Sequence, residues 1–286
     1  MQANKKVSVR DVIDAKGRER LAVLTAYDYS TALVCDKAGI DILLVGDSAS
    51  MVVLGHTTTV NIGMDEMRIF CGAVSRGSKR AMIVGDMPFG SYQPSPSVAV
   101  ENAVRLIKAG CEVVKLEGGS EIISTVRAIV DAGIPVMGHI GLKPQTSSLW
   151  EGYRMQGRDA QSAMKLLGDA KELEKAGVFS IVLEMVASEV AEEITKGVKV
   201  PTIGIGSGTG CDGQVLVLHD MLGIYEDFKP RFVKRYAEMS RTIYDAVSTY
   251  ITEVKGMKFP EESNTFHINP EELNGFRETM RRSKAK

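Results

Sequence analysis

The sequence predicts a (β/α)8 TIM barrel, an α/β fold in which eight parallel strands close into a cylinder inside a ring of helices. The first observation behind this prediction is a recurring unit, in which an amphipathic stretch ends at a glycine and a short apolar run follows. The second is that polar residues do not alternate along the apolar runs, which indicates strands buried on both faces, as in a parallel sheet. The third is their number, because eight runs exceed the roughly five or six strands of an open sheet.

The elements follow in order along the chain. The eight strands are expected at 21–26, 41–46, 81–85, 112–117, 135–140, 179–184, 201–205 and 214–218. Helices between them should end at left-handed glycines, namely Gly39, Gly110, Gly133, Gly177 and Gly197. N-caps are expected at Ser95, Ser120 and Ser188.

The interval between the seventh and eighth strands is short. Fewer than about a dozen residues separate them, which is at or below the usual length of a crossover. We therefore expect helix 7 to be missing or reduced to a single turn. The glycine-rich stretch 204–210 is then a tight turn or, alternatively, a phosphate-binding loop.

The chain continues well beyond the last strand. Apolar residues recur at spacings of three and four from Phe232 to Val254, which predicts one long amphipathic helix that begins near Pro230 and ends at Gly256. In the remainder we expect a short helix at 270–282. We predict one barrel domain over 1–256, which includes the long helix, and a C-terminal tail over 257–286.

Composition excludes several classes of protein. The chain is 44% hydrophobic and 25% charged, which is ordinary for a globular protein, and its net charge of −1 gives no reason to expect a nucleic acid or an anionic membrane as partner. No apolar run approaches the roughly 20 residues of a membrane span, and no signal peptide is visible. The four cysteines are scattered, without a C-x-x-C pair. These features predict a cytoplasmic protein.

Ionisable residues mark the ends of five consecutive predicted strands, from the second to the sixth. In chain order they are Asp47, Asp86, Lys115 with Glu117, His139 and Glu184. Because the active site of a TIM barrel lies at the C-terminal ends of its strands, we expect these residues to converge in one site.

Residue types indicate the chemistry of that site. Three carboxylates, Asp47, Asp86 and Glu117, without a cluster of Cys or His, favour a hard cation such as Mg²⁺ or Mn²⁺ over zinc. Glu184, behind an apolar run, suits a proton-transfer group, and the alternative is a helix-capping carboxylate. Lys115 could neutralise a substrate carboxylate, form a Schiff base, or pair with Glu117. His139 either lines the pocket or is a satisfied core histidine.

A resemblance to a known family becomes specific at these residues. The stretches LTAYDYSTA, LLVGDSASMVVLGHTTT, GDMPFGSY, VKLEGG, GHIGLKPQ, VLEMV and IGIGSGTGCDGQVLVLHDMLG are similar, in the same order, to the motifs of the ketopantoate hydroxymethyltransferase family. The similarity covers roughly residues 20–255. It implies that Asp47, Asp86 and Glu117 bind Mg²⁺ and that Glu184 is the proton acceptor. It further implies that the 2-oxo acid is contacted by Asp47, Ser48, Asp86 and Lys115, with His139 lining the pocket.

The resemblance also implies a reaction. The enzyme would be a one-carbon transferase that moves a hydroxymethyl group from 5,10-methylenetetrahydrofolate to 3-methyl-2-oxobutanoate through an enolate and an aldol-type addition. The product would be 2-dehydropantoate, an intermediate of pantothenate biosynthesis. The family further implies a homo-oligomer, commonly a decamer.

Three alternatives stay open from the sequence. The first is another metal-dependent aldolase or lyase acting on a 2-oxo acid. The second is a metal-free aldolase with Lys115 as a Schiff base. The third, of a different class, is a non-catalytic barrel that binds a ligand, although such a protein would be expected to have lost the charged strand ends.

Overall fold

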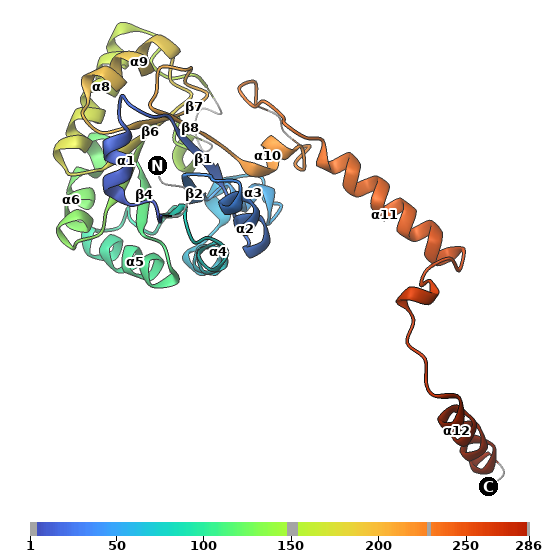
Figure 1. The fold of residues 1–286 in the computed structure, drawn as a ribbon. Coiled ribbons are helices and arrows are strands. Elements are labelled where there is room, and N and C mark those ends of the chain that lie inside the picture. Colours follow the sequence, from blue (N-terminus) through green and yellow to red (C-terminus); the bar gives the residue numbers. More distant parts are fainter. Residues whose placement is uncertain (1–4, 148–153, 228–229, 285–286) are drawn as a thin grey trace. The chain divides into compact units, whose positions relative to one another are not determined.

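Eight parallel strands form a closed barrel in the order β1 to β8, as the sequence predicts (Figure 1). The structure, a computed structural model, describes residues 5–147, 154–227 and 230–284. The strands are β1 Leu21–Thr25, β2 Ile42–Val45, β3 Met82–Asp86, β4 Val113–Glu117, β5 Val136–Gly141, β6 Ser180–Glu184, β7 Thr202–Ile205 and β8 Gly213–Leu216. All eight lie where the apolar runs predict them.

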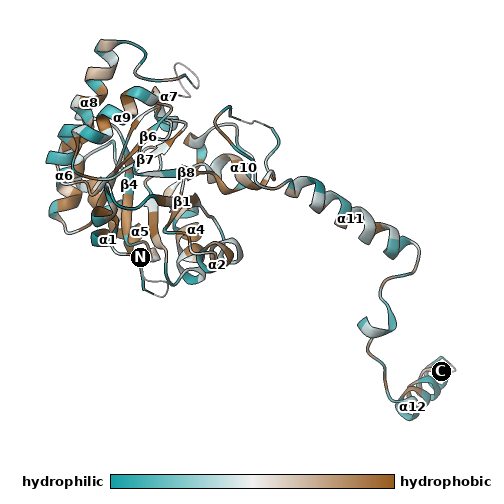
Figure 2. Cartoon of the chain, turned by 45° about the horizontal axis from the view of Figure 1, so that its top comes forward, coloured by the Kyte–Doolittle hydropathy of each residue, from teal (hydrophilic) through white to brown (hydrophobic). Residues whose placement is uncertain are grey.

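Helices surround this barrel. The first unit of the chain, Met1–Ala237, contains α1 Val9–Ala15, α2 Tyr29–Lys37, α3 Ala49–Val52, α4 Met64–Gly77, α5 Pro96–Ala109, α6 Ile123–Asp131, α7 Pro144–Ser147, α8 Ala160–Lys175, α9 Ser188–Gly197 and α10 Leu218–Leu222. Two short 3₁₀ turns add η1 Thr59–Asn61 and η2 Ser120–Ile122. The strands are coloured as hydrophobic and the outer faces of the helices as hydrophilic in Figure 2, which is the pattern of a parallel barrel.

No helix separates β7 from β8, which confirms the prediction for this interval. Residues 206–212 form turns, with Gly206 and Gly208 at positive φ. The glycines here serve a tight reversal, since a side chain at positive φ would be strained. At Gly208 a Cβ would also meet the side chain of Ser188.

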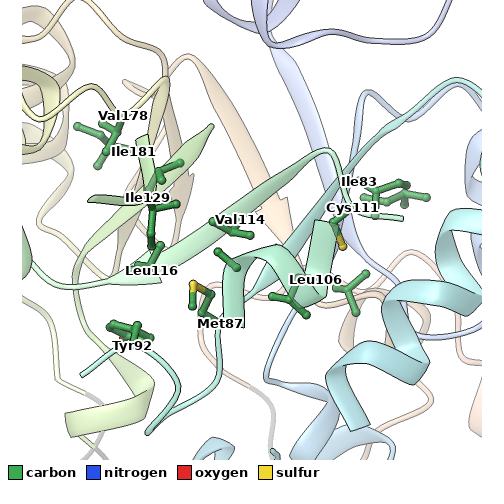
Figure 3. Close-up of a cluster of buried hydrophobic side chains, with 14 of the residues drawn as sticks. Ile83, Met87, Tyr92, Leu106, Cys111, Val114, Leu116, Ile129, Val178 and Ile181 are labelled. Atoms are coloured by element: carbon green, nitrogen blue, oxygen red, sulfur yellow. The ribbon is translucent and has the colours of Figure 1, made fainter. Parts of the chain in front are cut away.

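Two apolar layers hold the barrel together. Successive residues of a strand point to opposite faces. In β2, for example, Ile42 and Leu44 belong to the cluster inside the barrel, whereas Leu43 and Val45 belong to the cluster between strands and helices. Figure 3 shows part of the outer cluster, including Leu106 and Leu116.

Some predicted caps are wrong. Ser95 caps α5 through its side chain, and Gly110 ends that helix in the left-handed conformation. Ser188 is the first residue of α9 and has no capping bond, because Ala187 occupies the N-cap. Ser120 begins a 3₁₀ turn before α6. Gly197 is the last residue of α9, and its missing side chain makes room for Leu167 instead.

The long C-terminal helix starts later than predicted. α11 spans Met239–Lys255, so the predicted start near Pro230 is wrong. Residues 230–237 form turns and irregular chain instead of helix. The backbone N–H of Val233 donates to the Pro230 carbonyl, and that of Tyr236 donates to the Met221 carbonyl. Phe232 and Tyr236 therefore lie at the spacing of the predicted helix but precede its first residue.

Residues 238–286 make up a second unit. It contains α11, the 3₁₀ turn η3 Glu262–Asn264 and α12 Pro270–Ser283, which confirms the predicted helix at 270–282. The assignment of the long helix to the barrel domain, with a boundary at 256, stays a prediction. No helix among the described residues is both long and apolar enough to cross a membrane.

Candidate active site

The strands carry charged residues inside the barrel at one end only. In β4, Val113 belongs to the inner apolar cluster, and Lys115 and Glu117 follow at intervals of two, so they share its face. The same spacing relates Val84 to Asp86 in β3, Met137 to His139 in β5 and Val182 to Glu184 in β6. Apolar layers therefore fill the barrel below, and a charged layer lies at the C-terminal ends of the strands.

Strand register brings these residues together. Asp86 pairs with Lys115 across β3 and β4, and Glu117 pairs with His139 across β4 and β5. Asp47 and Ser48 follow β2 directly. A cavity of about 340 Å³ is lined by all seven predicted site residues, Asp47, Ser48, Asp86, Lys115, Glu117, His139 and Glu184.

Lys115 and Asp86 form the central ion pair. The Lys115 ammonium donates to both carboxylate oxygens of Asp86, at 2.7 and 2.8 Å, and lies 3.9 Å from Glu117 Oε1. All three side chains are buried. Burial alone would lower the pKa of Lys115, but Asp86, Glu117 and Asp47 outweigh it and raise that pKa. Lys115 is therefore a cation held among carboxylates rather than a neutral amine.

The carboxylates themselves repel one another. Burial, followed by the negative charges of Asp86 and Glu117, raises the pKa of Asp47 well above its usual range. Burial also raises the pKa of Asp86, against the opposing effect of Lys115. Burial would raise the pKa of Glu117 too, but His139, Lys115 and the backbone N–H of Gln145 outweigh it and lower that pKa. The cluster holds more acidic groups than the single lysine can neutralise.

His139 connects this cluster to Glu184. Its Nδ1 lies 3.5 Å from Glu117 Oε1, and its Nε2 lies 3.2 Å from Glu184 Oε2. Burial and Lys115 act to lower the pKa of His139, but the two glutamates outweigh them and raise it to about 9. Neither ring nitrogen has a partner in hydrogen-bond geometry among the described residues. His139 therefore lies between two acids that favour its protonated form, and it lines the cavity.

Gln145 is a site residue that the sequence does not reveal. It is fully buried in α7, and its Nε2 donates to Asp47 Oδ2 and to the Met87 carbonyl, both at 3.0 Å. Its backbone N–H donates to Glu117 Oε2 at 3.1 Å, and its Oε1 lies 2.8 Å from the hydroxyl of Tyr92. Gln145 thus holds two of the predicted metal ligands at once. An uncharged amide gives no sign of this in the sequence beyond its position shortly after a strand.

Other contacts were also not predicted. Ser48 Oγ lies 2.8 Å from the hydroxyl of buried Tyr27. The far side of the cavity is lined by residues that follow β8, among them Asp220, Tyr225 and Phe232. This wall depends on the chain folding back over the barrel mouth, so no local pattern could indicate it.

The donor chemistry fits a hard divalent cation, although the ligands are not preassembled. Asp47, Asp86 and Glu117 offer only oxygen, and Glu117 Oε1 has no partner in hydrogen-bond geometry among the described residues. No group of three or more His, Cys, Asp or Glu side chains within the described ranges is arranged to hold a metal. In this arrangement Lys115 binds the oxygens of Asp86.

The sequence is similar to proteins of one known family over most of its length. A family profile described as "Ketopantoate hydroxymethyltransferase" matches residues 6–262. The 3-methyl-2-oxobutanoate hydroxymethyltransferase of Nitrosopumilus maritimus (strain SCM1) is 55% identical over 96% of this chain and 98% of its own length. The protein of the same name from Cenarchaeum symbiosum (strain A) is 56% identical over 91% of this chain and 98% of its own length.

Solved structures are similar in fold. Phosphoenolpyruvate phosphomutase from Streptomyces platensis subsp. rosaceus has a TM-score of 0.60 at 15% identity, over 97% of both chains. A 2,3-dimethylmalate lyase of the PEP mutase/isocitrate lyase superfamily has a TM-score of 0.54 at 14% identity, also over 97% of both chains. At these identities the likeness shows a shared barrel fold.

Proposed function

The chain belongs to the ketopantoate hydroxymethyltransferase family, and from this premise we propose how its cavity transfers a hydroxymethyl group to 3-methyl-2-oxobutanoate. The transfer is a step of the pantothenate pathway, and we propose 5,10-methylenetetrahydrofolate as the one-carbon donor. The observation that carries the proposal is the cavity itself. It gathers a lysine among carboxylates on β3 and β4 and a separate glutamate on β6.

The acidic cluster is proposed to bind Mg²⁺. Asp47, Asp86 and Glu117 would hold the ion, since three buried carboxylates that repel one another are stabilised by a cation. When bound, Mg²⁺ would supply a fixed positive charge for the 2-oxo oxygen, where negative charge develops. This requires Lys115 to release Asp86, and its ammonium is then available to the substrate carboxylate.

Lys115 and Ser48 are proposed to orient the 2-oxo acid. A lysine ammonium that stays charged can neutralise the substrate carboxylate in a buried site. The same charge disfavours the Schiff-base alternative, because an amine must lose its proton before it attacks a carbonyl. Ser48, just after the C-terminal end of β2, has a hydroxyl group that lies in the cavity lining next to Asp47 in sequence.

Glu184 is proposed to remove the proton from C3 of the substrate. The C3–H bond breaks, its proton moves to Glu184, and the electron pair forms the enolate. Water adds to the methylene carbon of the donor, its two C–N bonds break, and tetrahydrofolate leaves with the water protons on N5 and N10. The enolate carbon then bonds to the carbon of the formaldehyde that remains. The resulting alkoxide takes the proton back from Glu184 to give the hydroxyl group. His139, 3.2 Å from Glu184 Oε2, would hold the carboxylate in position.

Product analysis tests this function directly. The protein is incubated with Mg²⁺, methylenetetrahydrofolate and a panel of 2-oxo acids, and products are identified by mass spectrometry. We expect 2-dehydropantoate from 3-methyl-2-oxobutanoate, loss of the product on chelation with EDTA, and recovery on adding Mg²⁺. If another 2-oxo acid is the favoured substrate, the assignment of 3-methyl-2-oxobutanoate is wrong. If activity is undiminished in EDTA, the assignment of Mg²⁺ is wrong.

A further inference from the structure

The cavity has a wall that the proposed binding of the 2-oxo acid does not use. This second wall consists of Asp220 of α10 and three residues that follow it, Tyr225, Arg231 and Phe232. The residues assigned to the 2-oxo acid and the metal lie instead on or directly after β2, β3 and β4. A cavity of about 340 Å³ reaches the range of sites that enclose a larger organic ligand, roughly 300–1,000 Å³.

The second wall is packed against the barrel. The ring of Phe232 lies on Gly206, where a Cβ would come within 2.7 Å of its Cδ1. Val233, next in sequence, is buried, and the Tyr236 N–H donates to the Met221 carbonyl at 2.8 Å. Arg235 Nη2 donates to the Tyr225 carbonyl at 3.3 Å. These contacts hold the wall in place over the barrel mouth.

Asp220 is the acidic residue of this wall. It lines the cavity and is partly buried, and among the described residues Arg235 is the charged group that acts on its carboxylate. Burial raises the pKa of Asp220 to about 6, while the charge of Arg235 acts to lower it. A half-buried acceptor that faces a cavity suits a ligand that presents N–H donors.

We propose that the second wall binds the pterin ring of the folate donor, with Asp220 accepting hydrogen bonds from the ring N3–H and 2-amino groups. The proposal rests on the proposed function, which requires a second substrate in the same cavity. A reduced pterin presents these two donors side by side, which matches the two oxygens of one carboxylate. Phe232 and Tyr225 supply apolar surface for the ring, and exposed Arg231 can meet the carboxylates of the folate glutamate.

Calorimetric titration of the full-length protein tests this subsite. Tetrahydrofolate, kept anaerobic, and 3-methyl-2-oxobutanoate are titrated separately into the wild type, Asp220→Asn and Phe232→Ala. Asp220→Asn keeps the shape but turns one acceptor into a donor, so tetrahydrofolate should bind about 10- to 100-fold more weakly. Phe232→Ala should weaken it about tenfold. The affinity of both variants for the 2-oxo acid should be unchanged.

A matched control separates hydrogen bonding from charge. Asp227→Asn removes a carboxylate that is exposed and does not line the cavity, and it should bind tetrahydrofolate as the wild type does. Equal losses in both Asn variants would overturn the role of Asp220, as would unchanged binding in Asp220→Asn. If the wild type binds the 2-oxo acid but no tetrahydrofolate, the folate donor of the proposed function fails, and the subsite fails with it.

Discussion

At the scale of residues, the cavity is defined by the pairing of its buried acidic and basic side chains. Asp47, Asp86 and Glu117 are buried within reach of one lysine, and His139 carries a second positive charge toward Glu184. Isolated buried carboxylates would be costly, so each of them is held by a lysine, a histidine or an amide. The site is therefore a network in which the loss of one partner leaves another unpaired.

Lys115 is predicted to act as a charge and not as an imine former. Borohydride added with the 2-oxo acid should leave no adduct on the protein by intact-mass spectrometry. Lys115→Arg should retain part of the substrate binding because the charge survives, although the planar guanidinium fits the Asp86 carboxylate differently. An adduct located at Lys115 by peptide mapping would move the enzyme to the Schiff-base class.

Gln145 is predicted to support both stability and cation binding. Gln145→Leu removes the donor to Asp47 and leaves buried polar groups unpaired, so the free energy of unfolding should fall by about 1–3 kcal/mol. Urea unfolding measures this loss, and Mn²⁺ titration followed by electron paramagnetic resonance should show weaker binding. Gln161→Leu, at an exposed position of α8, is the control and should change neither. Mn²⁺ binding as tight as in the wild type would limit Gln145 to a structural role.

At the scale of elements, the backbone at the ends of β5 and β6 fixes the position of the proposed base, Glu184. β5 ends at Gly141, at φ +96°, and β6 ends at Glu184 beside it in register. Met185, the next residue, is one of two non-glycine residues at positive φ in the described chain, and its carbonyl accepts from the Gln156 N–H at 2.7 Å. The backbone around the proposed base is thus fixed from both sides.

Gly141→Ala is predicted to disturb this junction. A Cβ there would lie 2.3 Å from the Glu184 carbonyl oxygen, in addition to the strain of a positive φ. Gly133→Ala is the matched control, because Gly133 has φ +84° but open space around a new Cβ. Thermal or urea unfolding should show a loss of about 1 kcal/mol for Gly133→Ala and of about 2–5 kcal/mol for Gly141→Ala. Equal losses would mean that the contact with Glu184 relaxes without cost.

The elements also show what local sequence can and cannot predict. The strands were predictable because a strand buried on both faces is apolar throughout, as in Ile42–Val45. The start of α11 was not predictable. Phe232 and Tyr236 lie at helical spacing, but they make tertiary contacts with Gly206 and Met221 and are not part of the helix. The charged half of the site followed from strand ends. Gln145 and the second wall could not be predicted in this way, since their roles depend on tertiary contacts and no local sequence pattern indicates them.

At the scale of the whole molecule, the barrel contains the proposed site and the C-terminal unit exposes apolar surface. In α11 the exposed large apolar residues are Ile243, Tyr244, Val247, Tyr250, Ile251 and Val254. An exposed apolar surface of this kind is typical of a site of contact with another protein chain. The exposed apolar residues of α11 are therefore where we place the contact of the predicted homo-oligomer.

Native mass spectrometry tests the oligomeric state. We predict a homo-oligomer of high order, such as the decamer that the resemblance in sequence implies, at micromolar concentration. Val247→Glu together with Ile251→Glu places charges on the exposed apolar residues of α11, and should reduce the assembly without unfolding the barrel unit. A wild-type monomer across the concentration series would contradict the prediction.

The proton step at Glu184 is the central claim, and hydrogen exchange isolates it from the folate step. The protein with Mg²⁺ in D₂O, without folate, should exchange the C3 proton of 3-methyl-2-oxobutanoate, which NMR follows directly. Glu184→Gln is nearly isosteric but cannot accept a proton, so exchange should slow by about 10²–10⁴-fold while the affinity for the 2-oxo acid changes little. Exchange at the wild-type rate in Glu184→Gln would show that Glu184 is not the base, and His139, 3.2 Å from it, would be the next residue to test.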